Sequence, residues 1–220
     1  MFLLRVRAVF EKTGRAKYIS HLDLNRCMLR IFRRSKLPIW YTEGFNPHPY
    51  YSFALALSLG FESRCEVFDF NLTDDDISLD EVRDRLNAVM PEGMRIVSVS
   101  PQRLKITAIE SADYDFSLVT DDVSGLHSAI DLLLSSEQIL IEKKTKKGIK
   151  TVDIKPDLIV LSITDAENSV DMSVKLPAGT QTNYNPTLLF QALEASTDIP
   201  FEPRNICRTG IFCKNNEIFS

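Results

Sequence analysis

The amino-acid sequence predicts an α+β protein made of two units that share one order of elements, β-α-β-β-α-β. Three observations favour this fold class. The 220 residues suffice for two cores of about 100 residues each. Runs in which apolar and polar residues alternate, typical of strands, are interspersed with runs of helical period. The same order can be traced in residues 1–101 and 112–220, so we predict two domains with these bounds, joined by the polar segment 102–111.

The first domain is predicted to begin with a strand and a well-marked helix. Its elements are, in order, a strand at 2–12, a helix at 20–36, a loop entering a strand at 40–57, a strand at 63–73, a helix at 73–93 and a strand at 94–102. Ser20 and Asp23 form a capping signature at the start of the first helix, and Pro38 is expected to end it. The acid-rich start of the second helix suits the positive end of a helix dipole. This order is the ferredoxin-like arrangement.

The second domain follows the same order with one addition, a hairpin after its first helix. Its elements are a strand at 113–120, a helix at 122–136, a hairpin formed by 138–145 and 150–155, strands at 157–164 and 169–177, a helix at 185–196 and a strand at 206–214. The hairpin is expected to turn at 146–148. Asn185 is the predicted N-cap of the last helix, with Pro186 at its first position. We interpret the two ferredoxin-like domains as a tandem duplication.

Composition and charge exclude several classes of protein. No apolar run approaches the roughly 18 residues of a membrane span, so we expect a cytoplasmic protein with no membrane partner. The four cysteines are scattered without a CxxC pair, which predicts neither a disulfide framework nor a zinc site. We expect no metal and no cofactor. The net charge is −4, yet residues 1–36 contain ten Lys or Arg and only two acids. Such regional charge predicts a local anion site.

Arginines gather on one face of the predicted helix 20–36. At about 100° per residue, the apolar side chains fall in one arc and the arginines in the opposite one. This basic face consists of Arg26, Arg30, Arg33 and Arg34. Arginines four residues apart repel one another by a few tenths of a kcal/mol, so a polyanion or an acidic protein surface is expected to neutralise them. Acids of the segment 62–84 are the intramolecular alternative, and a solvated face is the simplest one.

The loop after this helix contains the sequence GFNPHP at 44–49. Two prolines forbid helix and stiffen the loop, so its side chains lose little entropy on binding. Asn46 and His48 can hydrogen-bond a base edge or a phosphate, and Phe45 can stack on a base. The alternative is that the aromatic residues anchor the core. His21, at the first position of the helix, is either structural or a second histidine for acid–base chemistry.

The stretch 18–72 resembles a bacterial family of uncharacterised domains, the radical SAM-linked proteins. The matching motifs are Ser20-His21-Leu22-Asp23, Arg33-Arg34, Gly44 to Pro49, and Leu57, Gly60, Ser63 and Glu66. Members are fused to radical SAM proteins or encoded near them. The resemblance, specific over about residues 1–105, implies cooperation with a radical SAM enzyme. This chain lacks the three-cysteine cluster of such an enzyme, and the neighbouring genes of some members suggest RNA by association.

Three hypotheses about function follow. In the first, the chain is a non-catalytic, RNA-binding or substrate-presenting accessory module of a radical SAM protein, with RNA rather than DNA as its nucleic acid. Its binding residues would be the basic face together with Phe45, Asn46 and His48. In the second, it is a metal-independent endoribonuclease with His21 and His48 as acid and base. In the third, it is a protein-docking scaffold without a nucleic-acid ligand. The sequence favours an accessory protein over an enzyme, because it contains no nucleophile elbow or phosphate loop.

Overall fold

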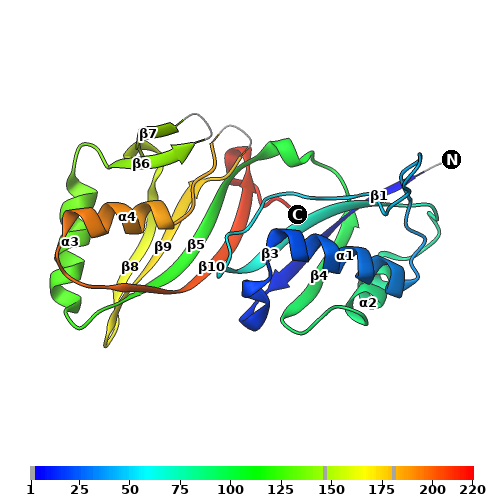
Figure 1. The fold of residues 1–220 in the computed structure, drawn as a ribbon, viewed down its shortest axis with the longest axis horizontal. Coiled ribbons are helices and arrows are strands. Elements are labelled where there is room, and N and C mark those ends of the chain that lie inside the picture. Colours follow the sequence, from blue (N-terminus) through cyan, green and yellow to red (C-terminus); the bar gives the residue numbers. More distant parts are fainter. Residues whose placement is uncertain (1–2, 146–147, 180–181) are drawn as a thin grey trace. The chain divides into compact units, whose positions relative to one another are not determined.

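The computed structural model describes residues 3–145, 148–179 and 182–220 (Figure 1). The chain is a mixed α+β protein whose sheets are mostly antiparallel, so the predicted α+β class is confirmed. It divides into two compact units. Unit 1 comprises Met1–Ile109 with Cys213–Ser220, and unit 2 comprises Glu110–Phe212. No helix in the described ranges is long and apolar enough to cross a membrane.

Unit 1 is a four-stranded antiparallel sheet with two helices. Its elements are β1 (Leu4–Lys12), α1 (His21–Ser35), β2 (Tyr51–Phe53), β3 (Glu62–Leu72), α2 (Leu79–Asn87) and β4 (Met94–Pro101). The strand order is β4-β1-β3-β2. Both helices pack against one face, because side chains from alternate positions of β1 and β3 form a single buried cluster with both of them. The expected strand start at residue 2 lies outside the described residues.

The start of α1 is as the sequence predicts, and a distant residue caps its end. Ser20 Oγ accepts a hydrogen bond from the backbone N–H of Asp23 at 3.1 Å. The helix ends at Ser35, and Lys36 follows in the left-handed conformation with φ 53°. Arg85 of α2 donates from Nε to the Ser35 carbonyl at 3.1 Å, and its guanidinium also donates to the Lys36 carbonyl. These bonds satisfy carbonyls that have no partner within α1. The helix ends ahead of Pro38 as expected, one residue short of the predicted bound at 36.

Two further helix starts differ from expectation. α2 begins at Leu79 rather than at 73, because Ser78 Oγ accepts from the backbone N–H of Glu81 and so fixes the cap there. The acidic run before it is exposed turn. α4 begins at Thr187 with Pro186 at the cap position. The predicted N-cap, Asn185, therefore lies one position before the observed cap. Its side-chain oxygen still accepts a hydrogen bond from the N–H of Thr187 at 2.9 Å.

Unit 2 contains four further strands that pair with one another and a separate hairpin. Its elements are β5 (Ile109–Val119), α3 (Val123–Ser135), β6 (Leu140–Thr145), β7 (Gly148–Asp153), β8 (Ile159–Asp165), β9 (Ser169–Pro177), α4 (Thr187–Ser196) and β10 (Glu202–Cys213). Its strand order is β10-β5-β9-β8, and β6 pairs with β7. The predicted turn residues 146 and 147 lie outside the described residues. Phe116 of β5 packs edge-on against Phe190 of α4, with ring centroids 4.9 Å apart.

A histidine joins α3 to the end of β8. His127 Nδ1 lies 2.6 Å from a carboxylate oxygen of Asp165, and its Nε2 lies 3.6 Å from Asp131. The hydrogen bond with Asp165, followed by the charges of Asp165 and Asp131, raises the pKa of His127 above its ordinary value. The protonated imidazole can then bridge two carboxylates.

This contact predicts a pH-dependent stability. Because the folded-state pKa is raised, the contribution is fully present below the ordinary histidine pKa and is lost as the pH rises through the folded-state pKa. We expect His127→Gln to lower the free energy of unfolding at about pH 5.5 more than at about pH 8. Urea unfolding followed by circular dichroism measures both values. An equal loss at both pH values would contradict the assignment.

Candidate nucleic-acid interface

The basic face of α1 is exposed to solvent as predicted from its period. Leu24, Met28, Ile31 and Phe32 are buried against the sheet. Arg26, Arg30, Arg33 and Arg34 are all exposed. Arg26 Nη1 pairs with Asp23 at 3.0 Å. The other three form no ion pair or hydrogen bond through their side chains within the part of the chain that the structure describes.

Five of the acids in the segment 62–84 pair with cations other than this face, and the exposed Asp74, Asp75 and Asp76 pair with none of its arginines in the described structure. On α2, Asp80 and Asp84 pair with Arg83 at 2.8 and 2.9 Å, and Glu81 pairs with Arg85 at 3.2 Å. From β3, Glu62 lies 3.5 Å from Lys17, and Asp69 pairs with Arg7. Among the described residues, no contact thus supports the alternative that acids of the segment 62–84 neutralise the basic face of α1.

A shallow pocket lies beside two of these arginines. Its volume is about 250 Å³, and it runs between α1 and the segment that follows α2. Arg30 and Arg34 form its charged edge, whereas Ile31, Val89 and Met90 contribute apolar surface. An anionic group and an apolar ring could therefore be held next to each other here.

The loop 41–50 is a narrow hairpin with internal hydrogen bonds. Tyr41 and Pro49 form an isolated bridge. The Thr42 N–H donates to the His48 carbonyl at 2.9 Å, and the His48 N–H donates to Thr42 Oγ1 at 3.2 Å. His48 Nδ1 also lies 3.0 Å from the Asn46 carbonyl. The loop is therefore held in one shape before any ligand binds.

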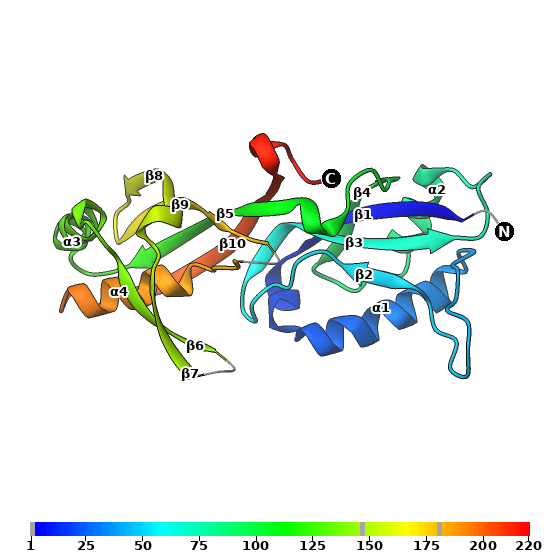
Figure 2. The same ribbon diagram turned by 90° about the horizontal axis from the view of Figure 1, so that it is seen from above.

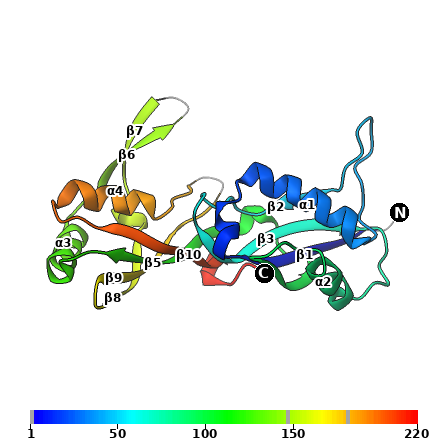
Figure 3. The ribbon, with the colours of Figure 1, turned by 60° about the horizontal axis from the view of Figure 1, so that its bottom comes forward.

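The tip of this hairpin presents an aromatic ring to solvent. Phe45 is completely exposed, and Asn46 and His48 are exposed beside it. Gly44 precedes the ring with φ 123°, a conformation that favours glycine. In Figure 3 the hairpin projects beyond the C-terminal end of α1. The expectation that aromatic residues anchor the core holds for Phe53, which contacts Phe10 and Phe68, but not for Phe45.

The structure does not bring His21 and His48 together. The ring of His21 lies 5.5 Å from that of Phe53, and Tyr51 Oη donates to the Asn25 carbonyl at 3.0 Å, so β2 runs along α1 (Figure 2). Within the described residues, His48 forms hydrogen bonds with Thr42 and Asn46 of its own hairpin, and this hairpin projects beyond the other end of the helix (Figure 3). The 15 residues of α1 span about 22 Å. An acid–base pair of these two histidines is not assembled in this arrangement.

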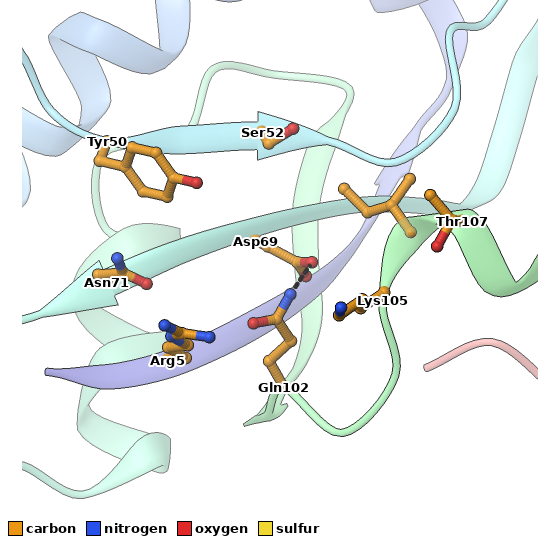
Figure 4. A pocket seen from close by; sticks show the side chains of 9 residues that line it. Arg5, Tyr50, Ser52, Asp69, Asn71, Gln102, Lys105 and Thr107 are labelled. Atoms are coloured by element: carbon orange, nitrogen blue, oxygen red, sulfur yellow. Dashed lines mark hydrogen bonds between the residues drawn. The ribbon is translucent and has the colours of Figure 1, made fainter. Parts of the chain in front are cut away.

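A second polar region, which the sequence analysis did not identify, lies on the face of the unit 1 sheet away from the helices. The fully buried Arg7 donates to both carboxylate oxygens of Asp69, at 2.7 and 2.9 Å, and stacks on Phe219 at 3.8 Å. Next to this pair is a cavity of about 290 Å³ (Figure 4). The signal that could have revealed it is a pair of polar residues two apart on each strand, Arg5 and Arg7 on β1 and Asp69 and Asn71 on β3.

One acidic cluster could share a cation. The carboxylates of Asp74, Asp75 and Asp76 lie within 4.8 Å of one another, and all three residues are exposed. Exposed acidic groups of this kind are common without an ion, and no buried donor completes the set among the described residues. We assign no metal site to it.

Comparison with known proteins assigns a family. A family model described as "Uncharacterized protein conserved in bacteria (DUF2344)" matches residues 5–186. The chain belongs to this family. The DUF2344 match includes the basic face of α1, the hairpin 41–50 and the cavity of unit 1. No curated protein matches the chain.

Three solved structures show distant similarity. The first is a chain of the structure described as "Crystal Structure of a Cbf5-Nop10-Gar1 Complex", which is 11% identical to this chain with a TM-score of 0.49. The match covers 94% of this chain but 49%, about half, of the length of that chain. An unknown protein from Galdieria sulphuraria is 9% identical over 92% of this chain and 99% of its own, with a TM-score of 0.28. The acetolactate synthase small subunit from Thermotoga maritima is 9% identical over 96% and 95%, with a TM-score of 0.25. Similarity at this level assigns no function to the DUF2344 chain.

Proposed function

We propose that this DUF2344 protein is an RNA-binding, substrate-presenting accessory module of a radical SAM enzyme. The observation that supports RNA binding is that Arg30, Arg33 and Arg34 on α1 are exposed and have no acidic partner in the described structure. The acids of α2 are paired with the arginines of α2 instead. The partnership with a radical SAM enzyme is supported by the resemblance of the motifs at 20–23, 33–34 and 44–49. The proposed module binds substrate without catalysing its conversion.

The arrangement suits a single strand better than a duplex. Arg26, Arg30 and Arg34 succeed one another at about 6 Å along the helix and would contact successive phosphates. The apolar pocket beside Arg30 and Arg34 would take a base. Phe45 would stack on another base, and Asn46 with His48 would bond its edge. A stiff hairpin loses little entropy in doing so.

The test is charge reversal on the basic face. Arg30→Glu with Arg34→Glu is expected to weaken binding of a labelled single-stranded RNA pool by about 100-fold or more and to reduce the salt dependence of binding. Fluorescence anisotropy over a salt series measures both. The matched control is Arg64→Glu with Arg95→Glu, at exposed arginines of β3 and β4, which changes the net charge by the same amount as the α1 reversal. This control should bind RNA like the parent at the same salt concentration. Affinity that survives the α1 reversal would refute the proposal.

Protein docking is the second candidate, and the exposed Phe45 favours it. A lone, fully exposed aromatic ring on a rigid hairpin is also what a protein partner with a complementary pocket would bind. Copurification with a radical SAM protein from nuclease-treated cells, lost in Phe45→Ala and retained in the α1 reversal, would favour docking over RNA. No comparable observation favours the endoribonuclease alternative, because His21 and His48, its proposed acid and base, do not lie together.

We further infer that the two units are ferredoxin-like copies of a tandem duplication. The two units have the same strand order, β4-β1-β3-β2 and β10-β5-β9-β8, when the strands of each unit are numbered along the chain without the hairpin β6-β7. The added hairpin follows the first helix of unit 2. A cross-strand ion pair occupies the same strand pair in each unit, Arg7 with Asp69 and, with the charges reversed, Asp113 with Lys175. Both cations stack on an aromatic ring, Phe219 in unit 1 and Phe212 in unit 2.

A further inference from the structure

The cavity on the open face of the unit 1 sheet has the features of a small-ligand site. Three strands and the segment after β4 surround it, and Figure 4 shows their polar side chains converging on one space. Its volume of about 290 Å³ is just below the range for small-molecule sites, about 300 to 1,000 Å³. The lining groups used below are Arg5, Tyr50, Ser52, Asn71, Lys105 and Thr107. A ligand of the size of one nucleotide fits this volume, whereas a longer segment does not.

The cavity attracts anions because its one carboxylate is already neutralised. Both oxygens of Asp69 accept hydrogen bonds from the buried guanidinium of Arg7, and one of them also accepts from Gln102 Nε2 at 2.7 Å. Arg5 and Lys105 line the same cavity and form no ion pair with any acid in the described ranges. The lining therefore has two uncompensated positive charges. An arginine suits a phosphate in particular, because its planar fork donates two parallel hydrogen bonds.

Neutral groups around these cations can hold the rest of a nucleotide. Ser52 and Thr107 offer hydroxyls, and the Asn71 amide offers both a donor and an acceptor for a ribose hydroxyl or a base edge. The Tyr50 ring is half exposed and is held by an edge contact with Trp40, at 5.4 Å between centroids. A ring fixed on one side and open on the other is a stacking surface for a base.

We propose that this cavity binds a phosphorylated nucleoside, with Arg5 and Lys105 on the phosphate and Tyr50 against the base. The ligand is either a free mononucleotide or the terminal nucleotide of an RNA, since both present the same chemistry. The proposal does not depend on RNA binding by α1, because the two sets of residues do not overlap.

Titration with adenosine monophosphate tests the proposal. We expect saturable binding in calorimetry, with NMR shifts at the amides of Ser52, Asn71 and Thr107. Arg5→Gln is expected to weaken this binding about tenfold or more. The matched control, Arg95→Gln on β4, replaces an exposed arginine outside the cavity lining and should bind like the parent. Adenosine should bind much more weakly than the monophosphate, and inorganic phosphate should compete with it.

The outcomes separate the two ligand sources and the two sites. Competition by a 5′-phosphorylated RNA, but not by its 5′-hydroxyl counterpart, would identify the end of an RNA. Absence of that competition, with binding of the monophosphate retained, would identify a free nucleotide. Arg30→Glu with Arg34→Glu should leave monophosphate binding unchanged. A failure of the proposed RNA binding at α1 can therefore be distinguished from a failure of the proposed nucleotide site. No binding of the monophosphate, equal affinity for adenosine, or full affinity in Arg5→Gln would overturn the proposal.

Discussion

Asp69→Ala is expected to lower the free energy of unfolding by about 3–5 kcal/mol. The carboxylate accepts two hydrogen bonds from Arg7, whose side chain is fully buried, and a third from Gln102. Removing it leaves a buried guanidinium without its counterion. Among the described residues, the Leu104 carbonyl, the Ser220 carbonyl and the Phe219 ring remain in contact with that charge. The desolvation of Arg7 is no longer offset. Urea unfolding followed by Trp40 fluorescence measures the effect in unit 1, because the chain contains one tryptophan.

Two controls separate a buried unpaired charge from the loss of an ordinary ion pair. Arg7→Met combined with Asp69→Leu removes both charges and should cost less than Asp69→Ala alone, since no buried charge is left unpaired. Asp84→Ala removes an exposed partner of Arg83 and should cost less than about 1 kcal/mol. A loss below about 1 kcal/mol for Asp69→Ala would contradict the role that we assign to the pair.

Phe68→Ala is expected to destabilise unit 1 by about 3–5 kcal/mol. Phe68 on β3 is fully buried. Its ring centroid lies 5.6 Å from that of Phe10 and 6.0 Å from those of Phe32 and Phe53. These rings come from β1, α1 and β2, so the truncated side chain leaves a cavity where the helix with the basic face packs on the sheet. Stability is again measured by urea unfolding with Trp40 fluorescence.

Phe45→Ala is the matched control for this substitution. The same atoms are removed from a completely exposed ring, and stability should change by no more than about 0.5 kcal/mol. RNA affinity, unlike stability, should fall in Phe45→Ala. The expected loss of binding free energy is about 1–3 kcal/mol if the ring stacks on a base. Comparable destabilisation in both variants would show that the exposure of the hairpin tip is not what the structure indicates.

Features that depend on neighbouring residues were readable from the sequence. The cap of α1 joins Ser20 to Asp23, three residues apart, and the basic and apolar faces follow from the helical period alone. The alternation in β1, β3, β5 and β9 likewise defined the strands, because successive side chains of a strand point to opposite faces. The exposure of the α1 arginines is a consequence of that period.

Only the tertiary structure decided which distant groups meet. Arg7 and Asp69 are 62 residues apart, and their pairing depends on the register of β1 against β3, which no local pattern fixes. The side chain that caps the end of α1 is Arg85, 50 residues away from Ser35. The separation of His21 from His48 follows from β2 running along α1, which places the hairpin beyond the end of the helix. Local hydrogen bonds and periodicity thus determined the elements and their exposed faces. Strand register and helix packing decided the ion pair, the cavity and the separation of the two histidines, because those contacts form only when the sheet is assembled.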